Sequence, residues 1–346
     1  MGILPKKDGA LKMLLMIAAI FIVLAGLKAA INILVPFLLS IFIAIICNPL
    51  IKKASEYKIP KVVSITLVIV IIVTVGLSLA GLVSKSLNEL MGLIPQYKQE
   101  LDGQFVWLTE KLARFNIKIS TEMLIKYFDP AEAMGLATTM LTSLGGVMAN
   151  SFLIIITVIF MLFEAPSLPT KLHLAFDDPE RKIRQIDRFV TSVNSYIAIK
   201  TMVSIATGII VSFMLWMFGL DFYLLWGVLA FLLNYIPNIG SIIAAVPAIL
   251  LAMIQLGLGE AGAIALIYLI INTIMGNVVE PRYLGRGLGL STLAVFLSLI
   301  FWGWLLGTVG MLLSIPLTMI IKIGLEGSEG GRWFSVMLSG DEIIEK

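Results

Sequence analysis

The chain has 346 residues, of which 59% are hydrophobic and 14% are charged, and its mean hydropathy is +1.01. Soluble domains carry about 25% charged residues, whereas residues 287–321 here contain no ionisable side chain, so the composition predicts a polytopic membrane protein. The net charge of +3 gives no support for nucleic-acid binding, and the single cysteine, Cys47, excludes an intrachain disulfide and a cysteine metal cluster.

Two apolar stretches, residues 11–27 and 30–50, open the chain and are separated by Lys28. They predict either a hairpin of two spans or one long tilted helix with a partner. A lysine-rich loop follows at residues 52–61, and positively charged short loops lie on the cytoplasmic side. The next span is predicted at residues 62–83, which completes an N-terminal transmembrane region over residues 1–84.

Residues 85–145 form the one large polar region. From Leu87 to Phe115 its apolar side chains recur at steps of three or four residues, which predicts an amphipathic helical segment between spans. Pro95 is expected to kink this helix or to mark a boundary. The apolar stripe packs either between subunits or on the chain's own membrane domain, and the sequence favours neither.

A transmembrane transport core is predicted over residues 146–325. It begins with a span at residues 150–163 that ends at Glu164, and a charged cytoplasmic loop is expected at residues 167–189. The next span, residues 193–218, carries Lys200. We interpret this lysine as one that reaches back to the membrane interface, in preference to a buried functional lysine.

Two segments of this core, residues 222–254 and 291–323, share one plan. Each has about 33 residues, or about 50 Å of straight helix, although about 20 residues cross a bilayer. Both contain helix breakers, namely Pro237, Gly240 and Pro247 in the first and Gly303, Gly307, Gly310 and Pro316 in the second. Each is therefore predicted to be a broken helical hairpin, re-entrant or spanning twice. Paired broken helices of this kind are typical of transporter sites.

The Gly303–Gly307 pair has GxxxG spacing, which permits close contact between helices. A further span is expected at residues 261–279, and residues 326–346 are expected to be a polar C-terminal tail. The predicted fold class is all-α, with broken or re-entrant hairpins and an amphipathic segment between spans.

Amides and hydroxyls gather near the breaks. The predicted substrate-binding residues are Asn234, Tyr235, Asn238, Ser241, Asn272 and Asn277. Few charges accompany them, which suits a neutral, hydroxyl-rich solute bound by hydrogen bonds. Glu164, Glu280 and Arg282 are candidates for ion coupling, although a solvated interfacial role is the alternative for each acid, and the spacing allows a Glu280–Arg282 ion pair.

Motifs of enzymes and of ATP-driven pumps are missing from the sequence. There is no G-x-x-x-x-G-K-[ST] motif, and one histidine and one cysteine are too few for a nucleophile–base or metal centre within the spans. We therefore predict a transporter without catalytic residues, metal or cofactor.

Three groups of residues resemble the autoinducer-2 exporter (AI-2E) family: the run Asn-Tyr-Ile-Pro-Asn-Ile-Gly at 234–240, Glu-Pro-Arg at 280–282 with the glycine-rich run to Ser291, and Gly-Trp-Leu-Leu-Gly at 303–307 with Gly310 and Pro316. The resemblance covers nearly the whole chain. It implies export of autoinducer-2 (AI-2), a small polyhydroxylated quorum-sensing signal, across the bacterial inner membrane by alternating access.

The same resemblance leaves one alternative open, because other members of the family are taken to be sodium or lithium/proton antiporters. It also implies a homo-oligomer, with a pentamer as the expected number, and rigid-body movement of a transport unit. Both termini are expected in the cytoplasm.

Overall fold

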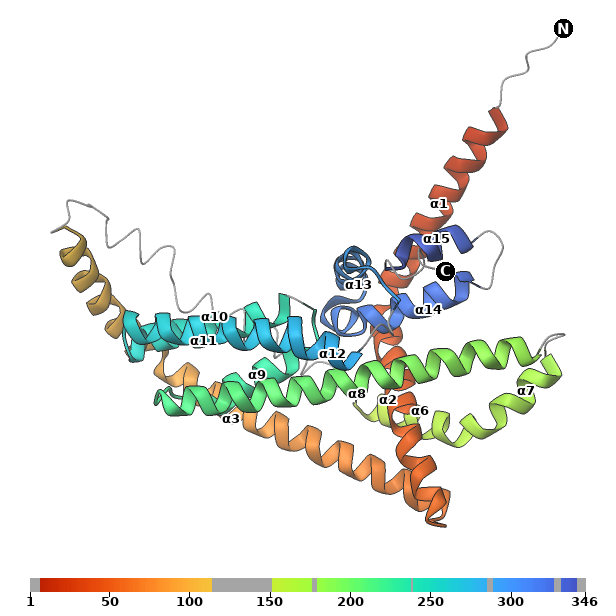
Figure 1. Cartoon of the computed structure of the whole chain (residues 1–346), viewed down its shortest axis with the longest axis horizontal. Helices are drawn as coiled ribbons and strands as arrows, with labels where there is room; N and C mark the ends of the chain where they lie inside the picture. The colour runs from red at the N-terminus through yellow and green to blue at the C-terminus, as the bar shows by residue number, and fades with distance from the viewer. Residues whose placement is uncertain are drawn as a thin grey trace, which may run out of the picture.

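The structure is a computed structural model that describes residues 7–113, 151–175, 179–237, 239–284, 289–326 and 331–340. Over these ranges the chain forms helices and no strand (Figure 1), which confirms the predicted all-α class. Six of the described helices are long and apolar enough to cross a membrane. Because lipid offers backbone groups no hydrogen-bond partner, helices with internally satisfied backbones are the expected solution. The protein is a multi-pass membrane protein.

The N-terminal helices α1 (Lys7–Ala29) and α2 (Ile31–Glu56) follow one another end to end, and α1 projects away from the body (Figure 1). The predicted alternative of a two-span hairpin is therefore wrong, since the chain only bends at Ala30 and does not turn back. Helix α2 packs along α6 (Ser151–Glu164) and buries the thiol of Cys47, which is 1% exposed.

Helix α3 (Lys61–Ala113) continues without interruption through residue 85 and through Pro95. Leu90 and Tyr97 are buried in the chain's main apolar core, and Leu87 packs against it. This part of the amphipathic stripe therefore packs on the chain's own membrane domain. Of the two outcomes expected at Pro95, a kink or a boundary, the boundary does not occur, because these contacts hold the helix on both sides of the proline. Residues 114–150, which include the end of the stripe, lie outside the described residues.

The charged segment before the fourth of the six candidate spans is helical. After η1 (Ala165–Ser167) come α7 (Leu168–Ala175) and α8 (Pro179–Met217), which pack against each other. The predicted loop at 167–189 is therefore wrong. Charged side chains of α8 that the structure describes, such as Glu180 and Arg184, are exposed, and these two pair one turn apart. Pro179 occupies the first helical position that proline favours.

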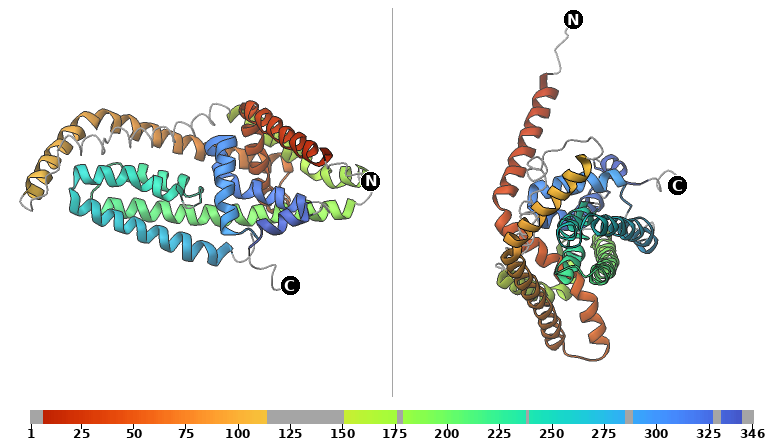
Figure 2. Two further views of the ribbon diagram at one scale, coloured as in Figure 1. Left: turned by 90° about the horizontal axis from the view of Figure 1, so that it is seen from above. Right: turned by 90° about the vertical axis from the view of Figure 1, so that its left-hand side faces the viewer.

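The first broken segment folds as α9 (Tyr223–Leu233) and α10 (Ile239–Gln255), followed by α11 (Leu258–Ile274), the π-helix η2 (Met275–Val279) and α12 (Glu280–Leu284). Figures 1 and 2 show α8–α11 running side by side along the long axis of the molecule. The arms α9 and α10 have 11 and 17 residues, fewer than the roughly 20 that a span needs. The segment is thus a hairpin of two short helices.

The second broken segment contains α13 (Thr292–Leu312) and α14 (Ser314–Glu326), and α13 crosses the direction of the α8–α11 bundle (Figure 2). Helix α13 has 21 residues, but its backbone leaves helical geometry at Gly307, where φ is 69° and ψ is −151°. The expected tail contains a further helix, α15 (Arg332–Leu338), which packs on α14, and the carbonyl of Leu338 accepts a hydrogen bond from the amide of Ser291 (2.9 Å).

Candidate substrate site at the broken hairpins

Both hairpin turns depend on a glycine in direct contact with the preceding arm. A Cβ added to Gly240 would lie 1.8 Å from the carbonyl oxygen of Leu233, and one added to Gly310 would lie 2.0 Å from that of Trp302. Side chains cannot approach that closely, so only glycine lets the second arm begin against the end of the first. The two glycines that align in the sequence repeat therefore make the same kind of contact.

The tip of the first hairpin is bound to α8 through side chains. The amide Nδ2 of Asn234 donates to Ser204 Oγ (2.9 Å), and the hydroxyl of Tyr235 donates to Thr201 Oγ1 (2.7 Å). Asn234 and Tyr235 are half-buried. Two predicted binding residues thus lie together. Sequence reasoning missed their hydrogen-bond partners, Thr201 and Ser204.

Lys200, one residue before Thr201, is buried and ion-paired. Its Nζ lies 2.7 Å from both carboxylate oxygens of Glu280, and the two side chains are 4% and 17% exposed. The interpretation of Lys200 as an interfacial, snorkelling lysine is therefore wrong. The Glu280–Arg282 ion pair that the spacing allowed does not form in this structure, where Arg282 is exposed and Glu280 binds Lys200.

Helix α8 presents a polar face to this region. Tyr196, Lys200 and Ser204 follow at intervals of four residues, which places them on one side of a helix, and all three are buried. The carboxylate of Glu280 and the hydroxyl of Tyr235 lie within electrostatic reach of Tyr196. This spacing of polar groups in an apolar helix is the sequence signal that could have identified α8 as half of the site.

The other predicted binding residues are less closely gathered. Ser241 is half-buried in the first turn of α10. Asn272 is half-buried on α11, and Asn277 is exposed on η2. Among the described residues, no hydrogen bond joins these three side chains to the hairpin tip. Asn238 lies outside the described residues.

The remaining helix breakers serve the hairpins themselves. Pro237 is half-buried in the first turn, while Pro247 in α10 and Pro316 in α14 are buried. A Cβ on Gly303 would lie 2.9 Å from Cγ of Met311, so Gly303 allows close packing within the second hairpin. Gly307, where a Cβ would meet no atom within 4 Å, provides the positive φ of the break instead. Sequence reasoning missed a second close approach, since a Cβ on Gly208 of α8 would lie 2.8 Å from the carbonyl oxygen of Gly227 of α9.

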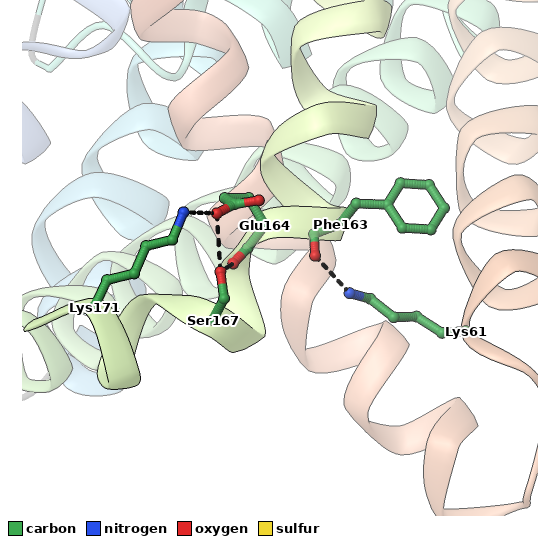
Figure 3. A network of polar contacts seen from close by, with 5 residues as sticks. All are labelled: Lys61, Phe163, Glu164, Ser167 and Lys171. Carbon is green, nitrogen blue, oxygen red and sulfur yellow. Dashed lines mark hydrogen bonds and ion pairs between the residues drawn. The ribbon is translucent and has the colours of Figure 1, made fainter.

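Glu164 lies at the end of α6, in a different environment (Figure 3). Its carboxylate accepts hydrogen bonds from Lys171 and from Ser167 Oγ (2.9 Å), and its side chain is 60% exposed. Beside it, Lys61 Nζ donates to the carbonyl of Phe163 (2.9 Å). These contacts fit the solvated role at a span end that the sequence also allowed.

An open groove of about 600 Å³ runs between α3, α8 and α9. Its lining is almost wholly apolar, with residues such as Leu79, Ile209 and Phe231. It offers few partners for a hydroxylated solute, so the polar hairpin tip is the better candidate site. The described part of the chain contains no group of three or more metal-binding side chains.

Comparison with known proteins identifies the family. The family described as AI-2E family transporter matches residues 11–328. The chain is 45% identical over 329 residues to the AI-2 transport protein TqsA of Escherichia coli K12, covering 95% of this chain and 96% of that protein. A putative transport protein of Haemophilus influenzae is 45% identical over 335 residues, with 95% and 96% covered. The putative transport protein YhhT of E. coli K12 is 39% identical over 334 residues, with 96% and 95% covered. The chain belongs to the AI-2E transporter family.

Proposed function

We propose that this protein exports autoinducer-2 across the bacterial inner membrane by alternating access. One observation carries the proposal: the polar tip of the first hairpin, Asn234 and Tyr235, lies against Thr201 and Ser204 of α8 within an apolar helical bundle. The likeness of nearly the whole chain to a relative named for AI-2 transport supports the substrate.

The chemistry of the tip suits such a solute. An amide and three hydroxyls both donate and accept hydrogen bonds, which matches a small molecule rich in hydroxyl groups. In the structure these groups bond to one another, so an entering solute exchanges hydrogen bonds and leaves no group unpaired. Exchange of this kind costs little, whereas an unpaired buried polar group costs about 1–3 kcal/mol.

The alternative of a cation/proton antiporter receives less support. Such a carrier needs an acid that titrates within the membrane, and Glu280 already holds Lys200 as its counter-ion. A relative at 45% identity is named for AI-2 transport.

The same proposal extends to assembly and to orientation in the membrane. We infer that the chain is not an enzyme, that it forms a homo-oligomer, and that both termini face the cytoplasm. Cysteine-accessibility labelling of each terminus in intact cells and in inverted vesicles tests the orientation, and labelling of either terminus from the outside would contradict it.

The decisive experiment measures labelled AI-2 in proteoliposomes, with and without imposed sodium and proton gradients. We expect saturable flux in the purified wild-type protein and a large loss of flux in Asn234→Leu/Tyr235→Phe. Gly262→Ala on α11 is the matched control, because a Cβ there meets no atom within 4 Å. Wild-type flux no faster than that of protein-free liposomes would reject AI-2 as the substrate.

A further inference from the structure

The Lys200–Glu280 pair is a costly feature for a membrane protein. Charged groups inside the bilayer are expensive, face the protein interior and mark functional paths. Replacing a buried pair with apolar residues is often neutral or stabilising, so folding alone gives little reason to keep one. The pair joins α8 to α12 through two contacts of 2.7 Å.

The backbone before Glu280 is also unusual. Residues 275–279 form the π-helix η2, and short π-helical turns occur often at functional sites. One extra residue in a turn rotates everything after it by about 100°. The π-helix therefore sets the direction in which the Glu280 side chain projects, which is toward α8.

The pair lies beside the proposed binding site. Lys200 directly precedes Thr201, which accepts the hydrogen bond of Tyr235. The Lys200 side chain is almost fully buried, whereas 17% of the Glu280 side chain surface remains exposed. The charges are thus within reach of the groups that would hold the solute.

We propose that Lys200 and Glu280 form a charge-balanced selectivity element, which restricts the hairpin-tip site to solutes without net charge. This inference rests on the proposed transport function. Together the two side chains contribute no net charge to the site. Removal of Glu280 leaves an uncompensated ammonium in a low-dielectric region, which favours anions, and removal of Lys200 leaves a carboxylate, which favours cations.

The test compares wild type with Glu280→Gln, Lys200→Met and the double variant. Glucose, gluconate and glucosamine serve as neutral, anionic and cationic hydroxylated probes of similar size. Each is measured as a competitor of AI-2 flux and, independently, by its effect on the thermal unfolding of the purified protein.

We expect wild type and the double variant to favour glucose. Glu280→Gln should shift the gluconate-to-glucosamine preference toward gluconate by about tenfold, and Lys200→Met should shift it about as far the other way. A pair that only holds helices together would weaken all three probes alike. Single variants that fold and keep the wild-type order of preference would overturn the proposal.

A further variant keeps the proposal testable if the single variants fail to insert into the membrane. Thr201→Asp adds one negative charge beside the intact pair and must favour glucosamine, and an unchanged order in this variant overturns the proposal. The two readouts separate the inference from the function on which it rests. If AI-2 flux is absent but the variants change the order in which the three probes stabilise the protein, only AI-2 is rejected as the substrate. If AI-2 flux is normal but the order of the probes does not change, only the selectivity element is rejected.

Discussion

Two glutamate–lysine pairs in this protein have the same chemistry and opposite surroundings. Glu164 and Lys171 meet at the end of α6, where their side chains are 60% and 63% exposed (Figure 3). Lys200 and Glu280 meet between α8 and α12, where theirs are 4% and 17% exposed. Water and salt compensate the first pair when it opens, but little can compensate the second. Burial, more than residue type, thus separates a surface contact from a candidate functional centre.

The largest expected effect comes from removing one charge of the buried pair. Glu280→Gln or Lys200→Met should destabilise the protein by about 3–5 kcal/mol, because a buried charge remains unpaired. Glu164→Gln should leave stability unchanged within error, because water replaces the lost partner. Unfolding of the purified proteins in detergent, followed by tryptophan fluorescence, measures both. Equal losses of stability at the two sites would show that burial does not distinguish the two pairs. The Lys200→Met/Glu280→Gln double variant should regain most of the stability.

The next effect tests packing at the hairpin tip. Gly240→Leu places a side chain where the carbonyl of Leu233 lies, so we expect transport to stop while membrane insertion persists. Gly240→Ala should cost about 1–3 kcal/mol through overpacking, and Gly262→Ala should cost far less. Flux and expression level are measured together. Normal flux in Gly240→Leu would show that the tip does not carry the solute.

A smaller effect is expected from single hydrogen bonds. Tyr235→Phe removes the bond to Thr201 and should cost about 0.5–1.5 kcal/mol of stability, with a severalfold rise in the AI-2 concentration at half-maximal flux. Ser167→Ala is the control, since it also removes a hydroxyl that donates a side-chain hydrogen bond, but at an exposed position, where the acceptor is the Glu164 carboxylate. Identical kinetics in the Tyr235 variant would place the binding site elsewhere.

The smallest effect concerns salt. Raising sodium chloride from low concentration to 1 M shortens the screening length to about 3 Å and should erase any residual difference between wild type and Glu164→Gln. The difference between wild type and Glu280→Gln should persist, because ions do not enter its surroundings. Thermal unfolding at both salt concentrations is the measurement, and loss of the Glu280 difference at high salt would show that the pair is hydrated.

The broken hairpins were predictable because the residues that break a helix act locally in the sequence. Proline, glycine and asparagine at residues 234–247 mark a turn wherever the chain lies, and the alignment of Gly240 with Gly310 identified both close backbone contacts. Long uncharged stretches likewise predicted a helical membrane protein. The assignment of Asn234 and Tyr235 to the site remains a prediction, now with partners on α8.

Two of the errors have a common physical cause, which is that charge alone does not reveal its environment. The sequence predicts an interfacial Lys200 because its partner, Glu280, lies 80 residues away. The charges of residues 167–189 predict a loop, although charged residues such as Arg184 are exposed on the helix α8. Pro95 predicts a kink or a boundary, and α3 continues through it because tertiary contacts of Leu90 and Tyr97 outweigh the loss of one backbone bond.

The burial of Cys47 has a practical consequence. It is the only thiol of the chain, and its side chain is 1% exposed against α6. A cysteine introduced at any accessible position will therefore be the sole fast-reacting group for a spin label or fluorophore, without prior removal of native thiols. Probes placed one at a time along α10 and α14 could then report when each hairpin arm changes its exposure during a transport cycle.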